Sequence, residues 1–392
     1  MAGLYFHIPF CKKACTYCDF HFSTTLDRVE AMVQALRTEL QRRTHELRGE
    51  AVHTIYFGGG TPSLLPERDL SAILNDVRKQ THVSDNAEVS MEVNPDDVST
   101  EAIAAWKRIG ITRLSIGIQS FNEERLRFMG RAHDAKQSVR SLELIAAAGF
   151  NSWTMDLIYG LPGMTEAEWN EQIEQALSFN PPHISAYCLT VEPRTALHKQ
   201  VDRGEVIAAP DEDQALQFEL LAERLEAAGY VHYEISNYGK PDHFSRHNTS
   251  YWQGVPYIGI GPSAHSFDGA VRRWNIANNN RYIGGVNAGE VYWEEERPTV
   301  QQRTNERIMT GLRTMWGVDL AELDGLTATT ERTMDCYAAS GHLLRSRTAA
   351  GGNRIVLTKA GKLLADRIAA DLFLTSPDGS GQRSPTRRDA NT

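Results

Sequence analysis

The sequence lacks the features that would indicate a membrane, a nucleic acid or an extracellular setting. Its 392 residues contain no run of about 18 apolar residues, and the amino terminus enters the strand-like segment 4–8 without the charged-then-apolar order of a signal peptide. Lys and Arg number 41 against 50 Asp and Glu, and this net charge of −9 argues against general attraction to nucleic acid or anionic membranes. We therefore expect a cytoplasmic protein that does not bind nucleic acid.

Cysteine is scarce, and its distribution argues against a disulfide framework. Of five cysteines, Cys11, Cys15 and Cys18 lie within eight residues, whereas Cys188 and Cys336 lie far apart in the chain. A disulfide-rich secreted domain instead spreads an even number of cysteines along a short chain. A reducing compartment fits this distribution best.

Short apolar runs alternate with amphipathic stretches as far as residue 190. The predicted strands are 4–8, 54–57, 88–93, 113–118, 153–158 and 184–189, and the predicted helices are 27–46, 66–79, 100–109, 122–129, 135–148 and 166–177. Six repeats of strand and helix predict an α/β fold with a parallel sheet covered by helices, either doubly wound or closing into a barrel. In both arrangements the functional site lies at the carboxyl ends of the strands.

The pattern changes after residue 190. A helix over 214–228 and strands over 231–235, 257–260 and 272–276 predict an extension of the sheet without long helices between these strands. Helices over 302–315, 331–340 and 359–372, with a hairpin over 343–357, predict a winged-helix-like module. We expect a core domain over 1–295, a smaller domain over 296–375 and a disordered tail over 376–392 that is rich in Gly, Ser, Pro and Asp.

Three thiols share the short loop that follows the first predicted strand, with the spacing C-x3-C-x2-C at Cys11, Cys15 and Cys18. Thiolates bind iron–sulfur clusters and zinc, and this spacing distinguishes the two only in part. Three ligands on a four-iron cluster leave one iron open to a further ligand. The alternative is a closed Cys3His zinc site, completed by His21 or His7.

The cysteine loop, with Tyr17 before its third cysteine, resembles the motif of the radical S-adenosylmethionine (SAM) superfamily. The preceding residues 5–10, Y-F-H-I-P-F, narrow the resemblance to the branch that contains oxygen-independent coproporphyrinogen III oxidase and the HemW-type heme chaperones. The resemblance extends from Tyr5 through Phe267, and more weakly to about residue 372. It implies a partial (β/α)6 barrel extended by additional strands, with a smaller C-terminal α+β winged-helix-like domain. It also implies a [4Fe–4S] cluster on Cys11, Cys15 and Cys18, with SAM at the open iron.

Glycines and polar residues at the predicted strand ends are the candidate SAM site. The segment 58–62, G-G-G-T-P, lets backbone amides approach a ligand closely, although a simple turn is the alternative. Polar groups at successive strand ends converge on one mouth, although each could equally have a capping or structural role. The resemblance implies a SAM site formed by Tyr5, Tyr17, Gly59, Gly60, Thr61, Glu92, Gln119, Arg131 and Asp156, with Arg131 facing a carboxylate. Less directly it includes Thr190 and His265, which correspond to positions near a second cofactor or substrate in the oxidase.

Two departures separate the sequence from the oxidase. Phe20 stands where the oxidase has a further cysteine, and only four residues precede Tyr5, where the oxidase has an N-terminal arm. Both departures fit the chaperone branch.

The segment 247–252, H-N-T-S-Y-W, also fits that branch, because it resembles its H-N-x-x-Y-W segment associated with heme binding. Imidazole can ligate heme iron, and Tyr and Trp offer flat apolar faces to a porphyrin. We predict heme contacts by His247, Asn248, Tyr251 and Trp252. The alternative is a polar loop whose aromatics cover the barrel end. The candidates for the iron ligand are His247, His243, His265, Cys188 and Cys336.

The resemblance therefore implies a radical SAM heme chaperone, which binds heme as cargo and passes it to acceptor proteins, some of them membrane-associated. The alternative is an oxygen-independent coproporphyrinogen III dehydrogenase, or another radical SAM enzyme that acts on a porphyrin-like substrate. Both alternatives share the cluster and the SAM site. Reductive cleavage of SAM would require an electron donor such as flavodoxin or ferredoxin.

Overall fold

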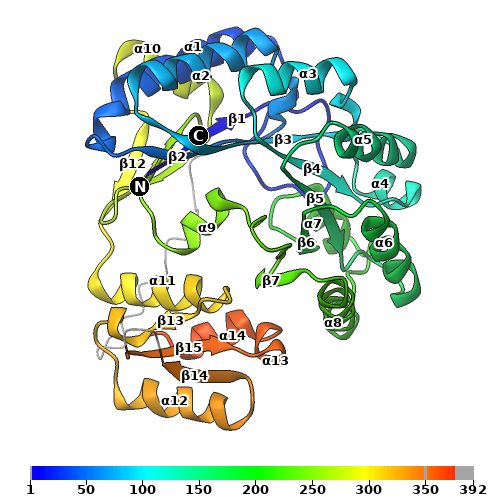
Figure 1. Cartoon of the computed structure of the whole chain (residues 1–392), viewed down its shortest axis with the longest axis vertical. Helices are drawn as coiled ribbons and strands as arrows, with labels where there is room; N and C mark the ends of the chain where they lie inside the picture. The colour runs from blue at the N-terminus through cyan, green and yellow to red at the C-terminus, as the bar shows by residue number, and fades with distance from the viewer. Residues whose placement is uncertain (1, 348–350, 376–392) are drawn as a thin grey trace. The chain divides into compact units, whose positions relative to one another are not determined.

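The computed structural model describes residues 2–347 and 351–375 (Figure 1). The chain divides into two units, Met1–Arg297 and Pro298–Thr392, and each is considered by itself. The tail predicted over 376–392 lies outside the described residues. None of the helices in the described ranges combines the length and the apolar character needed to cross a membrane.

Six parallel strands in sequence order form the centre of the first unit. They are β1 (Ala2–Ile8), β2 (Val52–Gly59), β3 (Val83–Val93), β4 (Arg113–Gln119), β5 (Ser152–Tyr159) and β6 (His183–Cys188). The helices between them are α1 (Val29–Arg43), α2 (Glu67–Gln80), α3 (Thr100–Ile109), α4 (Glu123–Phe128), α5 (Ala135–Ala147) and α6 (Glu166–Ser178), and they cover the outside of the strands (Figure 1). Leu4, Phe6 and Ile8 of β1 are fully buried beneath this layer. The predicted parallel α/β fold is confirmed.

Further strands extend the sheet at both edges, as the sequence predicted. β9 (Tyr257–Ile260) pairs in parallel with β1, and β10 (His265–Phe267), β11 (Arg272–Asn275) and β12 (Trp293–Glu296) continue outward in antiparallel pairs. At the other edge, β8 (Asn237–Gly239) is antiparallel to β6 and pairs with β7 (Val231–Glu234). One sheet of twelve strands results.

The later helices differ in part from the prediction. α8 (Asp211–Ala227) was expected, whereas α7 (Ala196–Asp202), α9 (Arg246–Trp252) and α10 (Asn279–Ala288) were not. No long helix lies between the three strands predicted over 231–276, where the only helix among the described residues is the seven-residue α9, and the ten-residue α10 follows them and joins β11 to β12. Its Gly285 lies against the chain before β12, where an added Cβ would come within 2.9 Å of Tyr292 Cβ. This close packing explains a glycine that weakens the helical pattern in the sequence.

A buried carboxylate joins α1 to the strands that extend the sheet. Glu39 is fully buried and pairs with Arg43 at 3.0 Å. Its oxygens also accept hydrogen bonds from the Gly261 amide at 2.8 Å, the Asn275 amide at 2.8 Å and the Tyr282 hydroxyl at 2.5 Å. A buried charge is tolerated only when it is paired and hydrogen-bonded in this way. The network therefore fixes the turn after β9 against α1.

The second unit is a small α+β domain with a three-stranded antiparallel sheet. Its helices are α11 (Val300–Leu312), α12 (Ala328–Ala339), α13 (Lys359–Lys362) and α14 (Ala365–Asp371), and its strands are β13 (Val318–Asp319), β14 (Leu343–Arg347) and β15 (Asn353–Leu357). Helices followed by a β14–β15 hairpin agree with the winged-helix-like prediction. The helix predicted over 359–372 is divided in two, because the backbone of Leu364 (φ −108°, ψ 18°) departs from helical geometry.

Candidate functional site

The cysteine loop lies between β1 and α1 and is held by backbone hydrogen bonds from three directions. The Cys11 amide donates to the Ser23 carbonyl at 3.0 Å, which closes the loop on itself. The Thr16 amide donates to the Met129 carbonyl after α4 at 3.0 Å, and the Thr16 carbonyl accepts from the Leu197 amide of α7 at 2.8 Å. The loop conformation is therefore set by neighbouring elements of the barrel.

All three cysteines of the loop are free thiols and partly buried. Burial raises the pKa of the Cys11 thiol, and burial likewise raises the pKa of Cys18 to about 12. Within the described residues, no three His, Cys, Asp or Glu side chains converge as ligands of one metal ion. In a four-iron cluster each thiolate binds a different iron, so the three sulfurs of this loop need not meet at one point.

Hydrogen-bond donors from β2–β5 reach two of the three sulfurs. The Thr61 hydroxyl donates to Cys11 Sγ at 3.5 Å, and Arg131 Nη1 donates to Cys15 Sγ at 3.4 Å. The Asn94 side chain lies between these donors, with its amide nitrogen 3.2 Å from Thr61 Oγ1 and its oxygen 2.7 Å from Arg131 Nη2. Thr61 follows β2, Asn94 follows β3 and Arg131 follows α4, so this group assembles only in the folded barrel.

Arg131 has an unused donor. Its Nη2 also donates to the Gly117 carbonyl at 3.0 Å, whereas its Nε is buried and has no hydrogen-bond partner among the described residues. The resemblance implied that Arg131 faces a carboxylate, and the partners that the structure gives its side chain are an amide, a carbonyl, a thiol and the Tyr17 hydroxyl. A buried guanidinium with a free N–H favours an anionic ligand group, so Arg131 fits a carboxylate brought by a cofactor.

The glycine segment after β2 brings backbone close to β1 and to the cysteine loop. A Cβ at Gly60 would lie 2.6 Å from the Phe10 carbonyl oxygen and 2.7 Å from that of Ile8. Gly59 has a φ of +106°, and its amide donates to Glu92 Oε2 at 3.1 Å. Both positions require glycine, one for space and one for conformation. The two glycines therefore allow the backbone after β2 to lie directly against β1 and the start of the cysteine loop.

Two carboxyl groups inside the barrel have displaced pKa values. Burial raises the pKa of Glu92 to about 7, although hydrogen bonds from the Tyr56 hydroxyl and the Gly59 amide oppose the shift. Burial also raises the pKa of Asp156 to about 7, and the charge of Glu92 adds to this shift. The Ser115 hydroxyl donates to Asp156 Oδ2 at 2.9 Å. Because both pKa values lie near pH 7, a cationic ligand bound nearby would shift these carboxyl groups strongly towards their ionised forms.

Three further predicted residues border the same mouth. Gln119 ends β4 with a left-handed φ of +64°, at a register shift relative to β5. Its side-chain nitrogen and that of Arg131 would both lie 3.0 Å from a Cβ added to Gly117. The Tyr5 hydroxyl hydrogen-bonds to His7 Nδ1 at 3.0 Å. Burial raises the pKa of Tyr17, which Arg131 lowers in turn by its charge and by a hydrogen bond.

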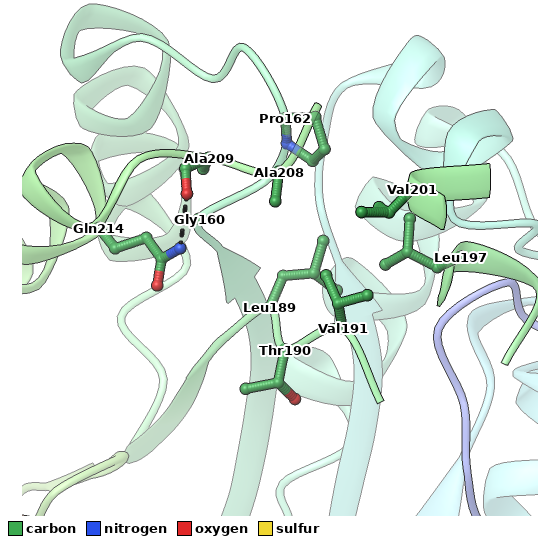
Figure 2. Close-up of a pocket in the computed structure, with 10 residues that line it drawn as sticks. All are labelled: Gly160, Pro162, Leu189, Thr190, Val191, Leu197, Val201, Ala208, Ala209 and Gln214. Carbon is green, nitrogen blue, oxygen red and sulfur yellow. Dashed lines mark hydrogen bonds between the residues drawn. The ribbon is translucent and has the colours of Figure 1, made fainter. Parts of the chain in front are cut away.

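Thr190 lies in a separate cavity of about 170 Å³ at the carboxyl ends of β5 and β6 (Figure 2). The other lining residues are mostly apolar: Gly160, Pro162, Leu189, Val191, Leu197, Val201, Ala208, Ala209 and Gln214. The Gln214 amide donates to the Ala209 carbonyl at 2.9 Å, as Figure 2 shows. The lining does not include Glu92 or Arg131, but it includes Leu197, whose amide donates to the Thr16 carbonyl of the cysteine loop at 2.8 Å.

His265 lies on the other side of the cysteine loop, on β10. Its exposed ring stacks on Trp274 with centroids 6.2 Å apart. Burial lowers the pKa of His7 to about 4. The hydrogen bond to the His21 carbonyl opposes this shift, and the charges of His21 and His265 add to it. His265 is therefore close to the end of β1 but stays at the surface.

The segment 247–252 is a helix rather than a polar loop. α9 covers the amino ends of the first strands, where Ser245 caps its amino terminus. His247 is fully buried, with Nδ1 2.8 Å from the Thr54 hydroxyl and Nε2 2.7 Å from the Tyr251 hydroxyl. Its ring also stacks on Tyr56 with centroids 5.0 Å apart. Both ring nitrogens of His247 therefore have partners inside the protein.

Comparison with known proteins identifies the family. A family model described as the radical SAM superfamily matches residues 5–176. The chain is 36% identical to the heme chaperone HemW of Mycobacterium tuberculosis over 379 residues, which cover 95% of this chain and 94% of that protein. It is 33% identical to the HemW of Bacillus subtilis, over 94% of this chain and 98% of that protein. The chain belongs to the HemW family of radical SAM proteins.

The fold of this HemW-family chain is also that of a solved structure. Coproporphyrinogen III oxidase (HemN) from Escherichia coli superposes with a TM-score of 0.80 at 24% identity, over 95% of this chain and 90% of that chain. This likeness concerns the fold alone. The resemblance stated from the sequence is confirmed, and superfamily membership implies a [4Fe–4S] cluster and SAM as cofactors.

Sequence reasoning missed two residues of the site. Asn94 joins Thr61 to Arg131, and His7 joins Tyr5 to the cysteine loop through a hydrogen bond of 2.8 Å between its Nε2 and the His21 carbonyl. His7 was considered only as a zinc ligand, whereas both of its ring nitrogens are hydrogen-bonded. A signal for Asn94 was available, because it lies two residues after Glu92 and directly after the predicted strand 88–93.

Proposed function

We propose that this protein is a radical SAM heme chaperone, which holds a [4Fe–4S] cluster on Cys11, Cys15 and Cys18, binds SAM at the mouth of the barrel and passes heme to acceptor proteins. The observation that carries the proposal is the cysteine loop, held beside donors from the segments after β2 and α4, in a chain that matches HemW proteins over nearly its full length. The oxidase alternative has support from a common fold only.

Different residues at the mouth of the barrel would contact different groups of SAM. Held by Cys11, Cys15 and Cys18, a [4Fe–4S] cluster would supply the electron for reductive cleavage of SAM. Glu92 and the Gly59–Thr61 segment lie where they would hold an ammonium group, and the free Nε of Arg131 would hold a carboxylate. Gln119 and Asp156 border the same space and would orient the rest of the ligand. Tyr5 and Tyr17 would pack beside it and exclude water.

α9 divides the H-N-x-x-Y-W segment into two faces. Residues four apart lie on the same side of a helix, so His247 and Tyr251 form one pair and Asn248 and Trp252 another. The first pair is hydrogen-bonded together and joined to Thr54 of β2. We propose that Asn248 and Trp252, on the other face of α9, contact heme directly. Both are partly exposed, as is Tyr251, whereas His247 is buried. His247 and Tyr251 then hold the helix in place, and His247 would ligate iron only after losing a hydrogen bond.

The experiment is anaerobic reconstitution with iron and sulfide, followed by heme titration and an assay for coproporphyrinogen conversion. Trp252→Ala removes an aromatic face worth about 0.5–1.5 kcal/mol beyond its area, so heme affinity should fall about tenfold while iron content stays unchanged. Trp293→Ala, on the edge strand β12, is the matched control and should bind heme as the wild type does. Conversion of coproporphyrinogen by the wild type, with no heme retained, would contradict the proposal.

The partners follow from the same proposal. Heme would be delivered to heme-accepting proteins, some of them membrane-associated, and an electron donor such as flavodoxin or ferredoxin would reduce the cluster if SAM is cleaved. The cytoplasmic location and the absence of nucleic-acid binding remain predictions from the sequence.

A further inference from the structure

The orientation of the Asn94 amide is determined by its neighbours. Arg131 has no acceptor, so the Asn94 oxygen must face Arg131 Nη2, which lies 2.7 Å away. The Asn94 nitrogen must then donate to Thr61 Oγ1 at 3.2 Å. Because the lone pairs of Thr61 receive this donor, its own hydroxyl hydrogen is available to Cys11 Sγ at 3.5 Å.

These hydrogen bonds form a continuous chain that connects Cys11 to Cys15 through side chains outside the cysteine loop. It runs from Cys11 through Thr61, Asn94 and Arg131 to Cys15, and each donor along it has an acceptor on the path. Arg131 Nη2 donates to the Gly117 carbonyl as well. Asn94 contacts neither sulfur. It decides instead where the Thr61 hydroxyl and the Arg131 guanidinium point.

Hydrogen bonds to cluster sulfurs stabilise the reduced cluster, which carries one more negative charge than the oxidised one. We propose that Asn94 is a positioning residue that raises the reduction potential of the cluster by directing Thr61 to Cys11 and Arg131 to Cys15. This inference rests on the proposed function, in which these cysteines hold a [4Fe–4S] cluster.

Asn94→Asp is the sharpest test, because it keeps the shape of the side chain. An aspartate oxygen in place of the Asn94 nitrogen would accept the Thr61 hydroxyl, which then turns away from Cys11, and it adds a negative charge nearby. The midpoint potential, measured without SAM by redox titration of the reduced-cluster paramagnetic signal, should become more negative. A tenfold fall in the reduction equilibrium constant corresponds to about 59 mV for a one-electron couple.

Two further variants make the test specific. Thr61→Val removes the donor itself and should also lower the potential, and in that background Asn94→Asp should cause a smaller shift than in the wild type. Asn75→Asp makes the same chemical change on the exposed face of α2 and should leave the potential unchanged. Iron content and thermal unfolding are measured for every variant.

The outcomes separate the inference from the function on which it rests. Wild-type potential in Asn94→Asp with full iron content would overturn the inference alone, as would an equal shift with and without Thr61. If Asn94→Asp fails to hold a cluster, Thr61→Val reports on the same donor, and a wild-type potential there would overturn it too. A wild type that holds no cluster would overturn the proposed function, and the inference with it.

Discussion

The two ends of the six parallel strands differ in how their polar groups are satisfied. At the carboxyl ends, Gln119 and Gly59 have left-handed backbones, and burial raises the pKa values of Glu92 and Asp156 to about 7. At the amino ends, α9 closes the barrel with a histidine whose two ring nitrogens are both hydrogen-bonded. Raised carboxyl pKa values therefore lie at the carboxyl ends, whereas at the amino ends burial lowers the pKa of His247 to about 3 and keeps its ring neutral.

This difference indicates that residues at the carboxyl ends of the strands favour ligand binding at a cost in stability. Unusual backbone conformations and buried ionisable groups destabilise a free protein and are typical of sites where a ligand offsets their cost. A neutral side chain such as His247, whose ring nitrogens are both hydrogen-bonded, stabilises the fold but has no free donor or acceptor for a ligand. Changes at the carboxyl ends should therefore affect cofactors, whereas changes at the amino ends should affect stability.

The largest effect should come from the cysteine loop. Replacing Cys11, Cys15 or Cys18 by Ala removes a thiolate that no other residue can supply, so iron and sulfide content after anaerobic reconstitution should fall to background. Cys188→Ala and Cys336→Ala are the matched controls and should keep the full cluster. A full cluster in Cys15→Ala, or stoichiometric zinc without iron in the wild type, would contradict the assignment of an iron–sulfur cluster to this loop.

The next effect should come from Gly60→Ala. The added Cβ would lie within 2.8 Å of three backbone atoms of Ile8 and Phe10, which cannot move without shifting the cysteine loop. We expect a loss of about 1–3 kcal/mol in unfolding free energy and most of the cluster, measured by chemical denaturation and iron content. Gly284→Ala meets no atom within 4 Å and should keep both. Normal iron content in Gly60→Ala would show that the loop tolerates displacement.

Glu92→Gln should lower SAM affinity by about one to two orders of magnitude at pH 8, because a hydrogen bond to a charged group contributes about 1.5–3 kcal/mol. An ammonium group favours the ionised carboxylate. Since burial raises the pKa of Glu92 to about 7, the difference between wild type and variant should shrink as the pH falls from 8 to 6. Calorimetric titration across this range measures it, and a constant difference would remove Glu92 from the site.

The raised pKa of Glu92 also makes the stability of the folded protein depend on pH, in the opposite direction to SAM affinity. The folded protein binds the Glu92 proton more tightly than the unfolded chain does, so in the absence of SAM the contribution of Glu92 to stability falls as the pH rises from about 4.5 through about 7. Glu92→Gln should therefore be more stable relative to the wild type at pH 8 than at pH 5.

The smallest effect on cofactors should come from the amino ends. His247→Ala leaves the hydroxyls of Thr54 and Tyr251 without their buried partner, which should lower the unfolding free energy by about 1–3 kcal/mol. Iron content and SAM affinity should stay unchanged. A loss of SAM binding without a loss of stability would show that the two ends are coupled through Tyr5, whose ring stacks on His247 at 6.4 Å between centroids.

The strands of the barrel were predictable because each is an apolar run bounded by polar or glycine-rich turns. β9 and α3 agree with their predicted ranges to the residue. α9 was missed because its buried face consists of His247 and Tyr251, which read as polar or half-polar in a hydrophobic pattern. α10 was missed because it contains three Asn and two Gly, and the packing of Gly285 on Tyr292 is visible only in three dimensions.

The site was predictable as a set of residue types but not as a network. Strand ends and the family resemblance together indicated Thr61 and Arg131. Nothing in the sequence brings Asn94 to both, since it lies 33 residues from the first and 37 from the second. Thr190 shows the same limit, because the mostly apolar cavity that it lines is formed by residues between 160 and 214 that come together only in three dimensions.

The hydrogen bonds that hold the cysteine loop also bear on the order of assembly. A zinc finger is unfolded without its metal, because the metal supplies most of the free energy of folding. Here the backbone of Thr16 is already bonded to the segment after α4 and to α7, and that of Cys11 to Ser23. Because these bonds join protein to protein, we expect the fold to depend less on the cluster than a zinc finger depends on its metal. Oxidative loss of the cluster should then leave a folded scaffold that can be reloaded without refolding.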